Sequence, residues 1–202
     1  MKKHQLTNKQ LKYFAKMASE SFANDPVHLY FNKNEKMRKK FIYHLLIERL
    51  ATSSREDIIY IDEENRGICV WRDAHNEYDA FDFLMYPNWV FLLLYLPKTI
   101  KMLITYGQLD CKVFPENTLI ISPVFVDPKH QGKGVASKLI KQGIADLAPK
   151  GYKLGLEAQD IKNVRFYEKL GFKVIKHDHW KREDVHNYYM MYEEDENDSS
   201  HL

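Results

Sequence analysis

Two glycines, Gly132 and Gly134, stand between an apolar run that ends at Val126 and a segment with helical periodicity that begins at Val135. Glycine permits backbone angles that are closed to other residues, so this spacing predicts a tight turn from a strand into a helix. The first amide groups of a helix have no partner within the helix, and the helix dipole is positive at that end. Such a start, reached through a glycine-rich turn, favours binding of a phosphate or pyrophosphate.

The spacing within this loop excludes two common phosphate motifs. A Walker loop requires Gly-x-x-x-x-Gly-Lys followed by Ser or Thr, and the chain contains no such segment. A dinucleotide-binding loop requires a third glycine where this chain has Ser137. The loop therefore belongs to another class of phosphate site.

A family resemblance rests on this loop and on a second segment downstream. Gln131-Gly132-Lys133-Gly134-Val135-Ala136 fits the pattern of Gln or Arg, two residues, Gly, one residue, then Gly or Ala. This is the pyrophosphate loop of the Gcn5-related N-acetyltransferase (GNAT) family. The segment from Leu156 to Phe172, which contains Asn163 and Tyr167, is also similar to that family. The resemblance covers residues 118–176.

The resemblance implies acetyl-CoA as the cosubstrate and indicates which residues bind it. In the family, the pantetheine arm pairs with the backbone of a strand that splays away from its neighbour. Ser122-Pro123 predicts a bulge or an edge in this strand, because proline cannot donate a hydrogen bond to a sheet. The implied CoA-binding residues are Val124, Phe125, Val126, Gln131, Gly132, Lys133, Gly134, Val135, Ala136, Ser137, Asn163 and Tyr167.

Transfer of an acetyl group from a thioester to an amine needs an acid, a base and donors for the oxyanion. The resemblance gives Tyr167 as the acid that protonates the leaving thiolate; the alternative is a tyrosine of the core. The backbone N–H of Phe125 or Val126 is a candidate oxyanion donor. Many family members carry a glutamate that acts as the general base where this chain has the apolar residues 119–121. Glu157 on the facing strand is the candidate base; a salt-bridged carboxylate, with water as the base, is the alternative.

The remaining sequence supplies the elements that position these residues. A capping box at Thr7 and Gln10 begins a first helix, which we expect to end at Asp25-Pro26. A second helix is expected from Asn34 to about Thr52, with Met37 and Phe41 at its buried edge. Periodicity predicts strands at 58–61, 67–71, 118–126, 152–158, 172–176 and 187–192, and helices at 135–147 and 161–170. The resemblance implies a single α/β GNAT-like domain over 1–192, with a mixed, splayed β-sheet flanked by helices.

Two segments stand apart from this pattern. Residues 79–115 contain the apolar stretch 89–96, bracketed by Pro87 and Pro97 and too short to span a membrane. We expect a helical insertion before the cofactor-binding strand, which packs on the sheet or at a dimer contact, or else forms a wall of the acceptor pocket. Residues 193–202 predict an acidic, disordered tail.

Composition narrows the class of protein. With 202 residues and 45% hydrophobic content, the chain can bury one sizeable core. A net charge of +2 gives no indication of nucleic-acid binding. Cys69 and Cys111 are far apart in the sequence, and neither has another Cys or a His at the spacing of metal ligands. We therefore expect reduced thiols and no metal site. Polar residues after Met1-Lys2-Lys3-His4 favour a cytoplasmic protein without a secretory leader.

These observations predict an acetyl-CoA-dependent N-acetyltransferase that acts on a primary amine by direct attack in a ternary complex. The aromatic-rich insertion and carboxylates such as Glu157 favour a small cationic acceptor, for example a polyamine, over a protein N-terminus. Only analogy with the family suggests a homodimer. Because the strand glutamate is missing, the alternative is a non-catalytic acyl-CoA-binding sensor. A third interpretation is an interaction protein built around residues 89–96.

Overall fold

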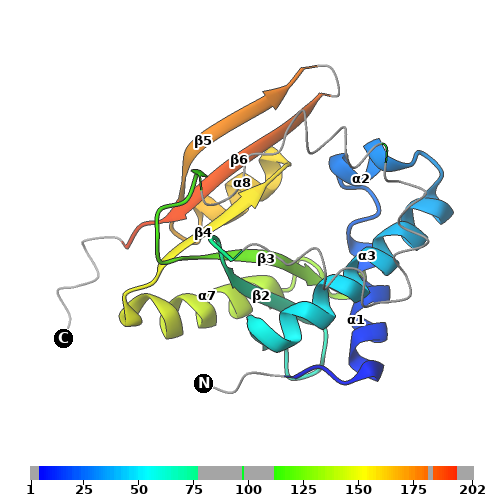
Figure 1. Cartoon of the computed structure of the whole chain (residues 1–202), viewed down its shortest axis with the longest axis horizontal. Helices are drawn as coiled ribbons and strands as arrows, with labels where there is room; N and C mark the ends of the chain where they lie inside the picture. The colour runs from blue at the N-terminus through cyan, green and yellow to red at the C-terminus, as the bar shows by residue number, and fades with distance from the viewer. Residues whose placement is uncertain (1–4, 77–96, 98–111, 182–183, 195–202) are drawn as a thin grey trace.

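The computed structural model describes residues 5–76, 97, 112–181 and 184–194. Within these ranges a six-stranded mixed sheet has the order β1-β2-β3-β4-β6-β5, with helices packed against it (Figure 1). The mixed α/β class predicted from the sequence is confirmed. The strands are β1 (Ile58–Ile61), β2 (Gly67–Asp73), β3 (Thr118–Val126), β4 (Lys153–Ala158), β5 (Phe172–Trp180) and β6 (Val185–Tyr192). The α-helices are α1 (Asn8–Ser21), α2 (Pro26–Phe31), α3 (Glu35–Glu56), α7 (Val135–Leu147) and α8 (Ile161–Glu168).

The first helix begins as predicted but is followed by a helix that the sequence analysis missed. Thr7 caps α1, and the Thr7 and Gln10 side chains form the expected capping box. α1 ends at Ser21, and Asp25 then accepts a hydrogen bond from the Val27 amide at 2.9 Å. Asp25-Pro26 therefore starts α2 rather than ending α1, because an aspartate cap followed by proline also suits the first turn of a helix.

The long helix α3 begins at the predicted cap and extends four residues beyond the predicted end. Asn34 accepts a hydrogen bond from the Met37 amide at 3.1 Å. Met37 itself is exposed, whereas Phe41 and Glu48 are buried. The expectation that Met37 lies on the buried edge was wrong, since the buried face lies one position further along, at Arg38.

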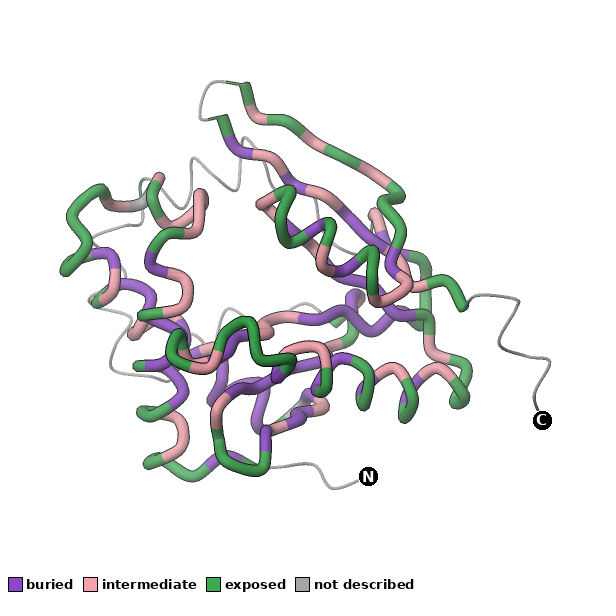
Figure 2. The backbone as a smooth tube through the Cα atoms, turned by 180° about the vertical axis from the view of Figure 1, so that it is seen from behind, coloured by how far each residue is buried: buried purple, intermediate pink, exposed green. Residues whose placement is uncertain are grey.

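The sheet separates two main clusters of buried side chains. Figure 2 marks along the backbone which residues of the strands and helices are buried. α7 and α8 cover one face, where Trp71, Leu139, Ile140 and Leu156 pack together. α1 and α3 cover the other face at β1, β2 and β3, where Phe14, Ile42, Val70 and Phe125 meet. The predicted hairpin of β1 and β2 is confirmed as an antiparallel pair, and the closing strands β5 and β6 are each longer than predicted.

Several predictions lie outside the described residues. The insertion at 79–115 falls mostly in 77–96 and 98–111, so its helices stay a prediction, and the tail is described only as far as Glu194. Cys69 is a buried free thiol, while Cys111 lies in the undescribed range. Among the described helices, none has both the length and the apolar character that crossing a membrane requires.

Candidate active site

The glycine-rich loop forms the turn that its sequence predicts. Gly132 and Gly134 have φ angles of 74° and 80°, in the left-handed region that favours glycine. Gly134 is the N-cap of α7, and no side chain caps the amides that open this helix. A Cβ added at either glycine would have no atom within 4 Å on the described chain, so the backbone of the turn is open. These features fit a bound pyrophosphate.

The strand that leads into this loop separates from its parallel neighbour. β3 pairs with β4 only from Thr118 to Ile121, whereas it continues alongside β2 as far as Val126. The register between β2 and β3 shifts where Ser122-Pro123 opposes Val70, which confirms a bulge. The alternative of an edge strand was wrong, because β3 lies between β2 and β4. The predicted splay is visible as the divergence of β3 and β4 in Figure 1.

The antiparallel register determines which backbone groups face this splay. The Asp127 amide donates to the Arg66 carbonyl at 2.8 Å. Hydrogen-bonded pairs recur at every second residue of an antiparallel ladder, so Phe125 directs its backbone N–H and C=O toward its partner Ile68 on β2. Val124 and Val126 alternate with it and direct their N–H and C=O groups toward the β4 side. The Val126 carbonyl accepts hydrogen bonds from Ser21 Oγ at 2.5 Å and Gln131 Nε2 at 3.3 Å. Val126, rather than Phe125, thus directs its amide toward the splay.

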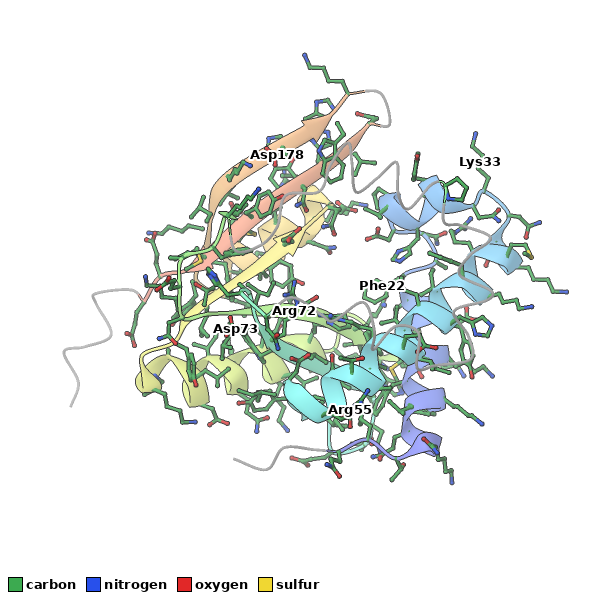
Figure 3. The ribbon with its side chains drawn as sticks, viewed as in Figure 1. Phe22, Lys33, Arg55, Arg72, Asp73 and Asp178 are labelled. Carbon is green, nitrogen blue, oxygen red and sulfur yellow. The ribbon has the colours of Figure 1, made fainter. Side chains whose placement is uncertain are left out.

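A cavity of about 730 Å³ occupies this splay. Residues from β3, β4, α7 and α8 line one part of it, and residues from the α1–α2 connection, α3 and β2 line another. Figure 3 marks Phe22, at the end of α1, and Arg72, on β2, which both line the cavity. The predicted site residues on its wall are Val124, Phe125, Val126, Gln131, Ala136, Glu157, Asn163 and Tyr167.

Comparison with known proteins agrees with this geometry. A family model described as an acetyltransferase (GNAT) domain matches residues 98–174, which include the loop, the splayed strand and Tyr167. Residues 98–174 therefore carry a GNAT acetyltransferase domain. The protein is thus an N-acetyltransferase with acetyl-CoA as the cosubstrate. This match argues against the third interpretation, an interaction protein that does not bind CoA.

Solved structures show the same GNAT fold. The chain resembles a histone acetyltransferase HPA2 and related acetyltransferase from Corynebacterium glutamicum with 18% identity and a TM-score of 0.61, over 93% of this chain and 92% of that one. An N-acetyltransferase from Staphylococcus aureus has 17% sequence identity and a TM-score of 0.61, over 93% of this chain and 98% of that one. The PaiA N-acetyltransferase from Thermoplasma acidophilum was solved in complex with coenzyme A. It has 14% sequence identity and a TM-score of 0.59, over 95% of this chain and 97% of that one.

Tyr167 lies where the core of this GNAT domain meets the cavity. Its side chain is 8% exposed and makes edge contacts with Phe166 and Phe172, at centroid distances of 5.1 and 6.1 Å. Burial, reinforced by the nearby Cys69, raises the pKa of Tyr167 well above its usual range. The hydroxyl therefore keeps its proton at physiological pH, as a general acid must.

Asn163 lies on the wall of the cavity, whereas five predicted CoA-binding residues of the loop do not: Gly132, Lys133, Gly134, Val135 and Ser137. Asp160 accepts a hydrogen bond from the Lys162 amide at 2.8 Å and caps α8, so Asn163 is not needed as the cap. Asn163 is exposed and lines the cavity. Gly132, Lys133 and Gly134 are exposed on the turn, Ser137 is half-buried on α7, and Val135 is buried against the core.

Glu157 belongs to a chain of hydrogen bonds at the cavity wall. Asn187 Nδ2 donates to Glu157 Oε2 at 2.6 Å, and Gln159 Nε2 donates to Asn187 Oδ1 at 2.7 Å. Asn187 is 2% exposed, so its amide is fixed within the protein. This arrangement holds a partly buried carboxylate at the cavity in a defined orientation.

The sequence analysis missed the residues that the N-terminal half contributes. Arg49 Nη2 donates to the carbonyl of Ser122 at 3.2 Å and to its Oγ at 3.1 Å, which ties α3 to the bulge of β3. Arg72 and Asp25 also line the cavity. No local motif marks Arg49 as a site residue, because it reaches the bulge through a contact distant in sequence. Asp25 was predicted only as the end of a helix.

Proposed function

We propose that this acetyltransferase transfers the acetyl group of acetyl-CoA to the primary amine of a small molecule, by direct attack within a ternary complex. A single cavity supports the proposal, because its wall includes both several of the residues that the GNAT motif assigns to CoA and a separate group of charged residues. Its volume of about 730 Å³ lies in the range typical of small-molecule sites.

The two groups of residues belong to different faces of the sheet. Leu119, Ile121 and Leu156 pack with α7 and α8 on one face. Successive side chains of a strand alternate, so Ser122 and Glu157 lie on the other face. Ser122 follows Ile121 and Glu157 follows Leu156, which are the last residues that pair before β3 and β4 diverge. CoA would enter from the α7–α8 side, and the acceptor from the face that carries Glu157.

On the CoA side, the amides that begin α7 and the open turn at Gly132 and Gly134 would hold the pyrophosphate. The backbone of Val124 and Val126 would pair with the pantetheine arm, and Asn163 would bond to it. The Val126 N–H is the proposed donor to the thioester oxygen, which becomes negatively charged as the amine attacks.

Glu157 and Tyr167 complete the proton transfers. Glu157 accepts the proton of the amine, directly or through water, and the amine nitrogen then forms a bond to the acetyl carbon. The bond between carbon and sulfur breaks, its electron pair remains on sulfur, and the Tyr167 hydroxyl donates its proton to that thiolate. The attacking nitrogen loses its second proton as the amide forms, and this proton returns to Tyr167 through water. Each step uses a group at the cavity wall.

The charged residues indicate the kind of acceptor. Of the carboxylates at the cavity, Asp25 caps α2 and Asp160 caps α8. Glu157 is held instead by the amide of Asn187, so it suits a cationic amine in the cavity. Arg49 and Arg72 on the same wall would also suit an acceptor that carries a carboxylate.

The test is the release of free coenzyme A thiol from acetyl-CoA with a panel of acceptors. The panel contains polyamines, aminoglycosides, free amino acids and peptides with unblocked N-termini, at equal amine concentration. We expect turnover with at least one small amine and a kcat/KM for it that exceeds that for every peptide. Turnover of peptides at a comparable or higher kcat/KM would contradict the small-molecule assignment.

A further inference from the structure

Three histidines gather on one face of the β5–β6 hairpin, outside the acetyl-transfer cavity. His179 and His186 are direct cross-strand partners, and their rings stack at a centroid distance of 4.0 Å with 5° between the planes. His177 Nε2 lies 2.9 Å from His186 Nδ1. None of the three lines the cavity.

Asp184, at the start of β6, adds a carboxylate to this cluster. Its Oδ1 lies 3.1 Å from His179 Nε2 and 3.9 Å from His186 Nε2. One atom from each of His179, Asp184 and His186 lies within 4.8 Å of the other two. The three atoms therefore surround a common point that solvent can reach, because His179 and Asp184 are exposed.

We propose that His179, Asp184 and His186 bind one Zn²⁺ ion. Two imidazole nitrogens and one carboxylate oxygen are common zinc ligands, and water would take the fourth position. Ligand atoms at zinc bond lengths of 2.0 to 2.1 Å lie about 3.4 Å apart in a tetrahedral site. The separations of 3.1 and 3.9 Å bracket this spacing. Because an imidazole binds a metal in its own ring plane, the stacked His179 and His186 rings must rotate about their χ angles and tilt apart to share the ion.

His177 serves as a positioning residue for this site. A zinc-bound imidazole donates its other N–H to an acceptor, which fixes the ring orientation. When His186 binds zinc through Nε2, its Nδ1 carries the proton and donates it to His177 Nε2 across the 2.9 Å contact. Tyr188 stacks on the His177 ring at 4.2 Å with 3° between the planes and holds it in place. The contact can thus accommodate the tautomer that zinc binding requires.

The ion would join the two strands near the end of the hairpin. His186 also adjoins Asn187, whose side chain points to the opposite face and holds Glu157. Zinc would therefore stabilise β6 next to a residue of the active site without contacting the reacting groups.

The experiment uses the full chain without an affinity tag, freed of metal by a chelator and titrated with Zn²⁺ in competition with a chromophoric zinc indicator. We expect one equivalent of tightly bound Zn²⁺ and a higher thermal midpoint with zinc than without. His179→Ala and His186→Ala should each raise the Kd at least about tenfold, and His177→Phe should raise it by about 10- to 100-fold. His44→Ala, at a histidine on α3, is the matched control and should leave the Kd unchanged.

Two results would overturn the site. One is the absence of saturable zinc binding by the wild-type chain. The other is binding that His179→Ala and His186→Ala leave unchanged, which would place the ion elsewhere. Asp184→Asn replaces the exposed ligand by a residue of the same size, so a Kd unaffected by this variant would remove Asp184 from the site even if an alanine variant failed to fold.

Discussion

Asn187 Nδ2 lies 2.6 Å from Glu157 Oε2, and this contact joins a buried residue of β6 to a carboxylate at the cavity. Asn187 is itself held by Gln159, so the Glu157 side chain has a fixed orientation toward the site. In the proposed mechanism, this carboxylate takes the place of the glutamate that many GNAT enzymes carry on the cofactor-binding strand, where this chain has apolar residues. The following predictions test this arrangement and the structure that supports it.

Glu157→Gln should reduce kcat at neutral pH by about 100-fold, because glutamine keeps the hydrogen bond from Asn187 but cannot accept the proton of the amine. Glu193→Gln is the matched control, since Glu193 bonds to Lys173 on the surface at 2.6 Å. Steady-state rates with saturating acetyl-CoA check the result. A Glu157→Gln enzyme as fast as the control would mean that water or another group removes the proton.

Gly134→Ala should raise the KM for acetyl-CoA at least about tenfold, a change of about 1.4 kcal/mol in binding. Alanine disfavours the φ of 80° at this position, so the amides that begin α7 would shift. Gly151→Ala is the control, because Gly151 has a φ of 83° and equally open surroundings but lies beyond the other end of α7, away from the loop that begins this helix. Both variants should lose similar stability; equal loss of acetyl-CoA affinity would contradict the role of the loop.

Asp62→Asn should lower the free energy of unfolding by about 2 kcal/mol at pH 7. The Arg66 guanidinium, with help from the Arg66 and Glu64 amides, lowers the pKa of Asp62 to about 2 from an ordinary value of 3.8. Because the folded pKa is the lower one, the stabilisation is present above pH 3.8 and is lost as the pH falls toward 2. Urea unfolding across this range measures it, and Glu64→Gln, at an exposed partner of Arg66, should cost much less. Identical pH profiles for Asp62→Asn and the wild type would contradict the assignment.

Gly143→Ala should destabilise the protein by about 1 to 3 kcal/mol, although alanine normally stabilises a helix. A Cβ at Gly143 would lie 2.7 Å from Cε2 of the fully buried Trp71, so α7 and β2 would have to move apart. The thermal midpoint of unfolding checks the prediction. A higher midpoint than that of the wild type would show that the contact is loose.

The sequence predicted the features of the site that depend on local signals. Gly132 and Gly134 reveal the turn because only a few residue types suit a positive φ, and Ser122-Pro123 reveals the bulge because proline cannot donate. Asp25-Pro26 misled the analysis, since the same two residues can end one helix or begin the next.

Other features arise only when distant segments meet. Arg49 reaches Ser122 from α3, Asn187 reaches Glu157 across two paired strands, and His179 meets His186 through the register of a hairpin. No spacing within the sequence encodes these contacts, because each depends on packing or on strand pairing. The contributions of Arg49 and Asn187 to the site therefore could not be predicted, although Glu157 itself was.

The most direct test of the account compares CoA thiol release by the wild type and by Tyr167→Phe, with the best small amine from the panel and with CoA binding measured separately. Phenylalanine keeps the ring contacts with Phe166 and Phe172 but lacks the proton. We predict a kcat about 100-fold lower with CoA affinity little changed, while Tyr152→Phe, at a tyrosine packed against the same core, keeps the wild-type rate. A Tyr167→Phe enzyme that retains the wild-type kcat would show that Tyr167 is a core residue and that the thiolate is protonated by another group.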